Sequence, residues 1–116
     1  MSDPLIQLRD ALRAFAVERD WEQFHSPRNL ATALAVEAAE LLEPFQWLND
    51  EQSANLSPET RAAVEQEMAD VLLYLVRLAD KLDVDLAAAA RAKIVKNGEK
   101  YPVEKARGSS RKYDEL

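Results

Sequence analysis

The stretch SPETRAAVEQEMADVLLYLVRLADKL, residues 57–82, decides the fold class of this 116-residue chain. A serine followed by proline is typical of a helix N-terminus, because the serine side chain caps the helix and proline fits the first helical position. Apolar residues then recur at alternating steps of four and three, which is the spacing of one helix face. These residues are Val64, Met68, Val71, Leu75, Leu78 and Leu82. The pattern predicts a long helix over residues 58–82.

A second line of residues runs beside this apolar seam and carries charge where a packed helix is normally uncharged. It consists of Glu67, Asp70 and Tyr74. Acidic residues three apart lie on the same helix face, so Glu67 and Asp70 present two carboxylates in one direction. The earlier segment AVEAAEL repeats this arrangement, with Glu37 on the apolar stripe of its own helix and Glu40 beside it. Two such helices facing one another would bring four carboxylates together.

Spacing alone does not establish a cation site, because the chain has 21 acidic residues. Chance gives roughly four acidic pairs three residues apart in a chain of this composition, and four are present. Two of the four pairs, Glu37/Glu40 and Glu67/Asp70, differ from the others because they lie on or beside the apolar stripe of their predicted helix. We therefore predict that Glu37, Glu40, Glu67 and Asp70 bind a divalent cation, with ordinary carboxylates at the boundary of a core as the alternative.

Composition restricts the other classes of function. With 47% hydrophobic residues and two glycines, the chain favours a helical globular domain over disorder or a turn-rich β fold. It has no cysteine, which excludes disulfides and thiolate chemistry, and its net charge of −6 argues against binding a nucleic-acid polymer. Neither a signal peptide nor a membrane-spanning run is evident, so a soluble, cytoplasmic protein without membrane contact is expected.

The remaining segments complete an all-α organisation. Further helices are predicted over residues 4–19, 27–43 and 85–97, the first two again opening with a capping residue and proline. The last is expected to end at a left-handed cap formed by Asn97 and Gly98. The segment after residue 98 is expected to be irregular, and residues 44–57 to form a loop.

The two tryptophans lie in the segments that flank the second predicted helix. Trp21 precedes it in DWEQFHS, together with His25, and Trp47 follows it in FQW. A helix of this length spans about 25 Å. The two indoles can therefore flank one ligand only if a loop folds back or a neighbouring subunit contributes one of them. Covering the core is the alternative role for each.

Several motifs together resemble the MazG-like all-α nucleoside triphosphate pyrophosphohydrolases, and among them the dCTP pyrophosphatases. The general pattern is ExxE on one helix and ExxD on a later one. More specific are ERDWEQFHSPRNL, FQW, DVLLYLVRLAD and RGSSRKYDEL. The resemblance extends from about residue 15 to the C-terminus. It implies a four-helix subunit that assembles into an oligomer, expected to be a homotetramer, with a domain over residues 1–106 and a C-terminal tail over 107–116.

The resemblance also implies a reaction and roles for particular residues. The reaction is Mg²⁺-dependent hydrolysis of dCTP, and of C5-modified dCTP, to the monophosphate and pyrophosphate. The four carboxylates match the metal ligands of the family and would be the catalytic residues. Residues matching positions that bind the nucleotide are Trp21 and His25 in the base loop, Trp47 as a stacking aromatic, Tyr74 near the sugar and phosphates, and Asn97 facing the triphosphate.

Two further features concern how the substrate is bound and which nucleotide it is. Lys93, Asn97 and Lys100 share a face of the last predicted helix and could contact phosphate oxygens, although a solvated basic face is the commoner explanation. Leu12 stands where some relatives have a histidine that contacts the nucleoside, which affects base or sugar selectivity rather than the hydrolytic chemistry. A MazG-like pyrophosphohydrolase of another or broader specificity is therefore one alternative.

Two further alternatives come from other classes of protein. A di-iron or di-manganese bundle uses Glu-x-x-His on two helices, whereas the one histidine of this chain lies in a predicted loop. A non-enzymatic helical interaction module would explain the apolar seam, but not the placement of Glu37 and Glu67.

Overall fold

The computed structural model describes residues 3–116, and every regular element in this range is helical. The chain divides into one compact unit that extends to residue 84 and a second over residues 85–116. The longer helices are α1 (Pro4–Glu18), α2 (Pro27–Leu42), α4 (Pro58–Lys81) and α5 (Leu86–Lys100). Shorter elements are the 3-10 turns η1 (Glu22–Phe24) and η2 (Tyr113–Glu115) and the helices α3 (Asp50–Ala54) and α6 (Val103–Ala106). The all-α prediction is confirmed.

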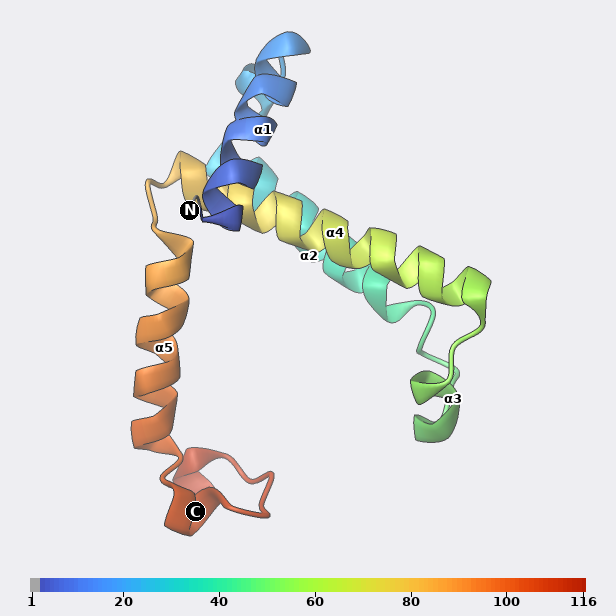
Figure 1. Ribbon diagram of the computed structural model, residues 1–116, viewed down its shortest axis with the longest axis vertical. Helices are drawn as coiled ribbons and strands as arrows, with labels where there is room; N and C mark the ends of the chain where they lie inside the picture. Colours follow the sequence, from blue (N-terminus) through green and yellow to red (C-terminus); the bar gives the residue numbers. More distant parts are fainter. Residues whose placement is uncertain (1–2) are drawn as a thin grey trace. The chain divides into compact units, whose positions relative to one another are not determined.

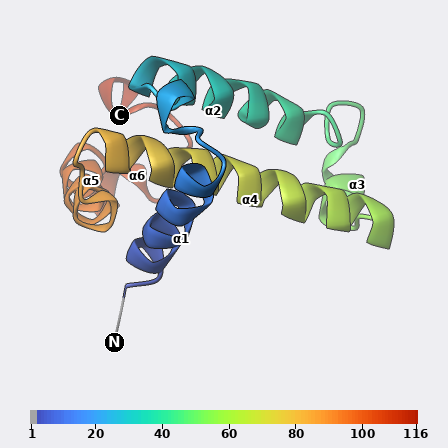
Figure 2. The same ribbon diagram turned by 90° about the horizontal axis from the view of Figure 1, so that it is seen from above.

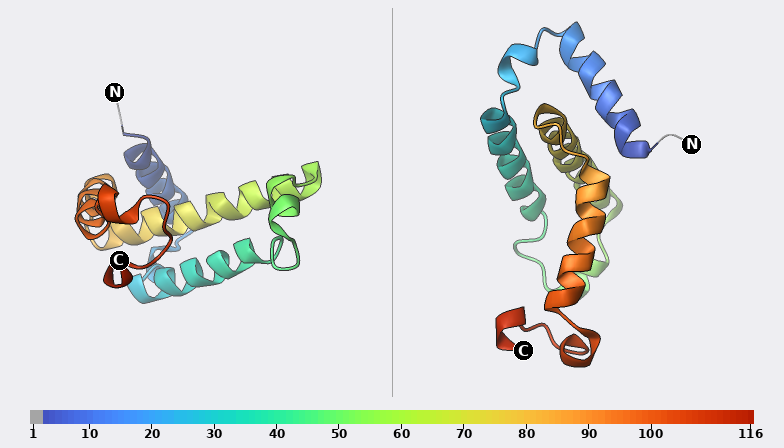
Figure 3. Two further views of the ribbon diagram at one scale, coloured as in Figure 1. Left: turned by 90° about the horizontal axis from the view of Figure 1, so that it is seen from below. Right: turned by 90° about the vertical axis from the view of Figure 1, so that its left-hand side faces the viewer.

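Within the first unit, α2 lies alongside α4, and α1 crosses α4 on another side (Figures 1 and 2). The turn η1 connects α1 to α2 near the C-terminal half of α4 (Figure 3). The carboxylate-bearing helices predicted from the sequence are therefore neighbours. This pairing positions the candidate site.

The starts of the helices agree with the capping residues expected from the sequence. The side chains of Asp3, Ser26 and Ser57 each accept a hydrogen bond from a backbone N–H of the first helical turn, and proline follows each of them. Asp85 caps α5 in the same way by accepting from the N–H of Ala88. These caps satisfy N–H groups that have no partner inside the helix.

Two expectations were wrong, one about where α5 ends and one about the segment between α2 and α4. α5 does not end at Asn97 and Gly98 but continues to Lys100, where the C-cap N–H of Tyr101 donates to the carbonyl of Asn97. A single glycine costs a helix only about 1 kcal/mol, which the neighbouring residues offset. The segment over residues 44–57 also contains α3, which a reciprocal capping box between Asn49 and Gln52 stabilises.

The second unit contains α5, α6 and η2. Its C-terminal turn lies against the end of α5, because Tyr101 and Tyr113 pack edge to face with ring centroids 6.2 Å apart. The ammonium of Lys100 lies 4.9 Å from the centroid of the Tyr113 ring. The tail expected to be irregular thus has local structure, whereas the division of the chain at residue 106 stays a prediction.

The fully buried core of the first unit is small. Its buried apolar residues are Ala16, Leu30, Val64, Val76 and Ala79. Met68 and Leu82 belong to the predicted seam but are more than half exposed. The seam is therefore buried only in part, because α1 contacts the C-terminal half of α4 and leaves the residues around Met68 open. None of the described helices is long and apolar enough to cross a membrane.

Candidate active site

Three of the four predicted metal ligands meet between α2 and α4. Glu37 comes from α2, and Glu67 and Asp70 come from α4. One oxygen from each carboxylate lies within 4.8 Å of the others, and all three side chains are half-buried. Glu40, one turn after Glu37, is also half-buried and is close enough to raise the pKa of Glu37. The acidic cluster defined by these four residues arises because two helices place their charged lines against each other.

The donor atoms of the acidic cluster fit a cation. The Oε2 atoms of Glu37 and Glu67 are buried, and neither has a hydrogen-bond partner within residues 3–116. Leaving a buried carboxylate oxygen without a partner is costly. The pKa of Glu37 is raised to about 7, first by its pairing with the neighbouring Glu67 carboxyl group, then by burial and by Glu40. Hard oxygen donors that repel one another and lack partners are the ligand set that a divalent cation stabilises.

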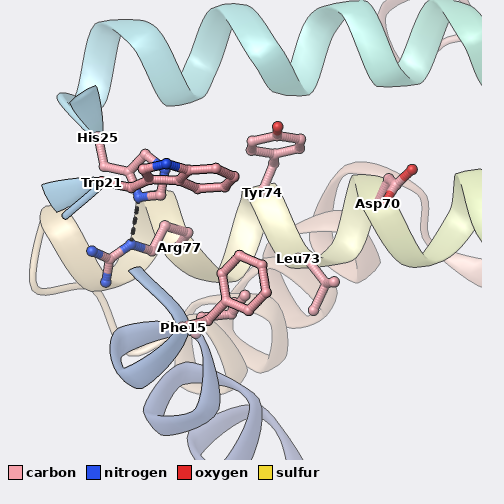
Figure 4. A pocket seen from close by; sticks show the side chains of 8 residues that line it. Phe15, Trp21, His25, Asp70, Leu73, Tyr74 and Arg77 are labelled. Atoms are coloured by element: carbon pink, nitrogen blue, oxygen red, sulfur yellow. Dashed lines mark hydrogen bonds between the residues drawn. The ribbon is translucent and has the colours of Figure 1, made fainter. Parts of the chain in front are cut away.

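A cavity of about 310 Å³ opens beside the acidic cluster. Figure 4 shows its aromatic and charged side chains, which come from α1, the segment around η1, and α4. The lining residues are Leu12, Phe15, Trp21, His25, Asp70, Leu73, Tyr74 and Arg77. Its size is at the lower end of the range for small-molecule pockets. Asp70 belongs both to this lining and to the acidic cluster, so the cavity and the carboxylates form one continuous site.

One end of the cavity is built from three aromatic rings. Trp21 packs edge to face on Phe15, with ring centroids 5.7 Å apart, and on His25 at 6.3 Å. Trp21 lies three residues after the last residue of α1, and its N–H donates to the carbonyl of Ala16. This bond closes the helix end and turns the chain, with Asp20 in the left-handed region at φ 54°. The turn therefore delivers Trp21 and His25 to the cavity.

An ion-pair network lies beneath the same end. The Arg77 side chain is only 4% exposed, and its guanidinium donates to His25 Nδ1, Asp80 and Glu22. Glu22 also accepts from Lys81, and the two Glu22 contacts hold its pKa below the ordinary value. The network ties η1 to α4. Burial lowers the pKa of His25, and the positive charge of Arg77 lowers it further.

Of the nucleotide-binding residues predicted from the sequence, Trp21, His25 and Tyr74 line the cavity. Trp47 does not, since it follows α2 with 87% of its surface exposed. Lys93 and Asn97 lie exposed on α5 in the second unit. The roles predicted for all of these residues stay predictions.

Sequence reasoning missed three lining residues, Phe15, Leu73 and Arg77. Arg77 continues the line of Asp70 and Tyr74 at steps of four and three, so the helix period could have found it. Its partner His25 lies 52 residues earlier in the chain, and no local pattern shows such a contact.

The comparison with protein families agrees with this geometry. The model of the MazG-like family matches residues 32–116. This chain belongs to the MazG-like family. MazG-like pyrophosphatases are metal-dependent, and in this MazG-like chain the acidic cluster is a set of residues that fits a metal.

Two relatives with known names are similar in sequence to this MazG-like chain. It is 53% identical over 104 residues to human dCTP pyrophosphatase 1, covering 88% of this chain and 61% of the relative. The Bos taurus dCTP pyrophosphatase 1 is 48% identical over 118 residues, covering 99% of this chain and 70% of the relative. The chain thus spans about three fifths of the length of the human protein.

A solved structure shows the same fold. The crystal structure of a pyrophosphatase from Archaeoglobus fulgidus matches with a TM-score of 0.82 and 38% identity, covering 88% of this chain and 95% of that chain. The predicted resemblance to the family is therefore confirmed, and so is the MazG-like fold.

Proposed function

We propose that this chain is a Mg²⁺-dependent nucleotide pyrophosphohydrolase that converts dCTP, and C5-modified dCTP, to the monophosphate and pyrophosphate. One observation carries the proposal: Asp70 lies both in the acidic cluster and in the lining of the aromatic cavity. A nucleotide has the matching layout, with a flat base at one end and a charged triphosphate at the other. The likeness to proteins named dCTP pyrophosphatase 1 supports the choice of base.

In this proposal the acidic cluster holds the metal, with Glu37 and Glu40 contributed by α2 and Glu67 and Asp70 by α4. Bound there, Mg²⁺ would supply charge neutralisation for the triphosphate and lower the pKa of a water molecule. The unpartnered Oε2 atoms of Glu37 and Glu67 are the donors whose burial a cation would offset. Lys93 and Asn97 are proposed to contact the phosphates.

The cavity would hold the base. Trp21 offers an aromatic ring to the base, and stacking of a base on an aromatic ring contributes about 1–3 kcal/mol. Tyr74 is proposed to lie near the sugar and phosphates. Phe15 and Leu73 line the same cavity with apolar side chains. Trp47, exposed in this chain, is proposed to stack on a base held by a neighbouring subunit of an oligomer.

Leu12 favours a second candidate, a pyrophosphohydrolase of broader nucleotide specificity. It lines the cavity with an apolar side chain, which offers the nucleoside no hydrogen bond. A site that reads fewer polar groups discriminates less between related substrates. The chemistry at the acidic cluster would be the same.

A nucleotide panel tests both candidates. dCTP, 5-methyl-dCTP, CTP, dTTP and dATP are compared at equal concentration, with Mg²⁺ and again with excess chelator. We expect at least tenfold higher kcat/KM for the two cytosine deoxynucleotides than for dTTP and dATP, and no turnover with chelator. Similar rates for all five would favour the broader enzyme, and no turnover of any would contradict the proposed activity.

Calorimetry separates the enzyme from a helical interaction module without reference to substrate. Mg²⁺ is expected to bind the parent protein and to bind the Asp70→Asn variant much more weakly. Glu65→Gln is the matched control, because Glu65 is an exposed carboxylate on the same helix and, among residues 3–116, forms an ion pair only with Arg61. Equal binding by all three proteins would place the cation elsewhere.

A further inference from the structure

Arg77 is a charged side chain that the proposed chemistry does not use, although it is buried to 3% exposure. Burying a guanidinium is costly unless all of its donors find partners. Here each of the three guanidinium nitrogens has a partner: Nε donates to His25 Nδ1 at 3.1 Å, one terminal nitrogen donates to Asp80 at 3.3 Å, and the other to Glu22. The guanidinium therefore links α4 to η1 and to His25, the C-cap residue of η1.

The bond to His25 determines where that imidazole carries its proton. A guanidinium has donors only, so the nitrogen that faces it must be an acceptor and cannot carry hydrogen. The neutral imidazole then has its proton on Nε2. Since Nδ1 is occupied by Arg77, Nε2 is the nitrogen left for a molecule that enters the cavity.

We propose that Arg77 is a positioning residue that holds His25 as the neutral Nε2–H tautomer, so that the free nitrogen of this ring is an N–H donor to an acceptor atom of the nucleobase. This inference rests on the proposed nucleotide substrate for its consequence, but the tautomer itself does not depend on any substrate. Cytosine offers suitable acceptors at its carbonyl oxygen and at its unprotonated ring nitrogen. Arg77 itself acts through His25.

The surroundings of His25 are consistent with a neutral ring. The charged groups near it are Arg77 and Lys81 from α4 and Glu22 from η1. Trp21 packs edge to face against the ring, with centroids 6.3 Å apart, and both residues line the cavity (Figure 4). Two cations and an indole, opposed by one carboxylate, disfavour protonation of the His25 ring, which would add a third positive charge.

The tautomer can be read directly, because His25 is the one histidine of the chain. A two-bond ¹H–¹⁵N correlation spectrum of the full-length protein at neutral pH distinguishes Nδ1–H, Nε2–H and the doubly protonated ring. We expect the pattern of the Nε2–H form, with an apparent pKa below that of a free histidine. An Nδ1–H pattern, or an imidazolium at neutral pH, would overturn the proposal.

The variant Arg77→Met removes the donor to Nδ1. We expect mixed tautomers of His25, an apparent pKa that moves toward the ordinary value, and a KM for dCTP raised about tenfold with kcat within twofold. Lys81→Met is the matched control, since it removes a neighbouring cation and a Glu22 ion pair but no contact with His25. It should leave the tautomer unchanged and KM within twofold.

A double-variant comparison separates positioning from direct contact, because Arg77 also lines the cavity. In a His25→Ala background, Arg77→Met should raise KM no further. If it raises KM as much there as in the parent, Arg77 contacts the ligand itself and the proposal is wrong. Arg77→Gln serves the same comparisons if Arg77→Met does not fold, because an amide side chain can either donate to or accept from Nδ1 and therefore no longer fixes one tautomer.

The two proposals fail separately. A protein that turns over no nucleotide removes the proposed function, while the spectrum still decides the tautomer. A protein that hydrolyses dCTP and shows the same tautomer with and without Arg77 removes this inference alone.

Discussion

Asp70 is the residue at which the two parts of the candidate site meet, and its substitution tests both. Asp70→Asn removes a charge and a ligand from the acidic cluster but keeps the shape of the side chain. We expect turnover of dCTP to fall at least about 100-fold, which corresponds to ~2.7 kcal/mol in the barrier. Steady-state kinetics measures the loss, and circular dichroism should show unchanged helicity.

The control for this prediction is again Glu65→Gln on the exposed side of α4, which should retain full activity. The metal-free Asp70→Asn protein should melt no lower than the parent, because the substitution relieves repulsion among carboxylates within 4.8 Å. Retention of more than a tenth of the activity would remove Asp70 from the metal ligands.

The two tryptophans should respond differently to truncation. Trp47 is 87% exposed, so Trp47→Ala should change the free energy of unfolding of the subunit by less than about 0.5 kcal/mol while raising KM for dCTP. Trp21 packs on Phe15 and His25, so Trp21→Ala should reduce both stability and binding. Urea unfolding and kinetics on both variants check this. A large loss of stability in Trp47→Ala with normal KM would make it a structural residue.

For single residues, the sequence predicts the position of a side chain when its neighbours lie on the same helix. Glu67, Asp70 and Tyr74 could be placed on one face because the helix period is fixed, and the same holds for Glu37. Arg77 was missed because its partners Glu22 and His25 come from a turn more than 50 residues away. Its third partner, Asp80, lies three residues later, but such a pair is also common on an exposed helix face and does not indicate burial.

Among the elements, α1 is fastened to α4 by an ion pair that gives a pH dependence. Arg13 binds Asp80 through two hydrogen bonds of 2.5 and 2.8 Å, and the Asp80 side chain is only 10% exposed. These bonds, followed by the charge of Arg13, hold the pKa of Asp80 below its ordinary value of 3.8. The folded state thus favours the ionised form, so this contribution to stability is complete above about pH 4 and is lost as the pH falls through the folded pKa.

Asp80→Asn tests this assignment. The variant should melt at a lower temperature than the parent at neutral pH, and the difference should shrink as the pH falls below 3.8. Thermal unfolding followed by circular dichroism across pH 2–7 measures both. Asp10→Asn is the control, because Asp10 is 58% exposed and lies 3.7 Å from Arg13 at the surface. A constant difference between parent and Asp80→Asn over the whole range would mean that the charge of Asp80 contributes nothing.

The starts of the elements were predicted more accurately than their ends. Proline after a capping residue specifies a helix start locally, and α1, α2 and α4 begin at those prolines. The end of α5 could not be read from Gly98, because this glycine is also tolerated inside the helix. The five-residue α3 was missed because its sequence, DEQSA, has no apolar periodicity that would mark a helix.

At the scale of the whole molecule, we predict self-association through apolar side chains that are exposed on α2 and α4. Val36, Met68 and Leu72 are 51%, 57% and 39% exposed. Light scattering after size exclusion should give a mass that is a multiple of 13.1 kDa, and we expect four subunits. Met68→Lys should shift the protein toward smaller species, whereas Glu65→Lys should not. A parent protein of 13.1 kDa at micromolar concentration would contradict an oligomer.

The central claim is that the acidic cluster and the aromatic cavity act together to cleave dCTP between its α and β phosphates. The most direct test is ³¹P NMR of the products formed from dCTP by the parent protein with Mg²⁺. We predict dCMP and pyrophosphate in equal amounts, formed by the parent and by Glu65→Gln but not by Asp70→Asn. Formation of dCDP and orthophosphate, or product formation that is unchanged in Asp70→Asn, would contradict the account.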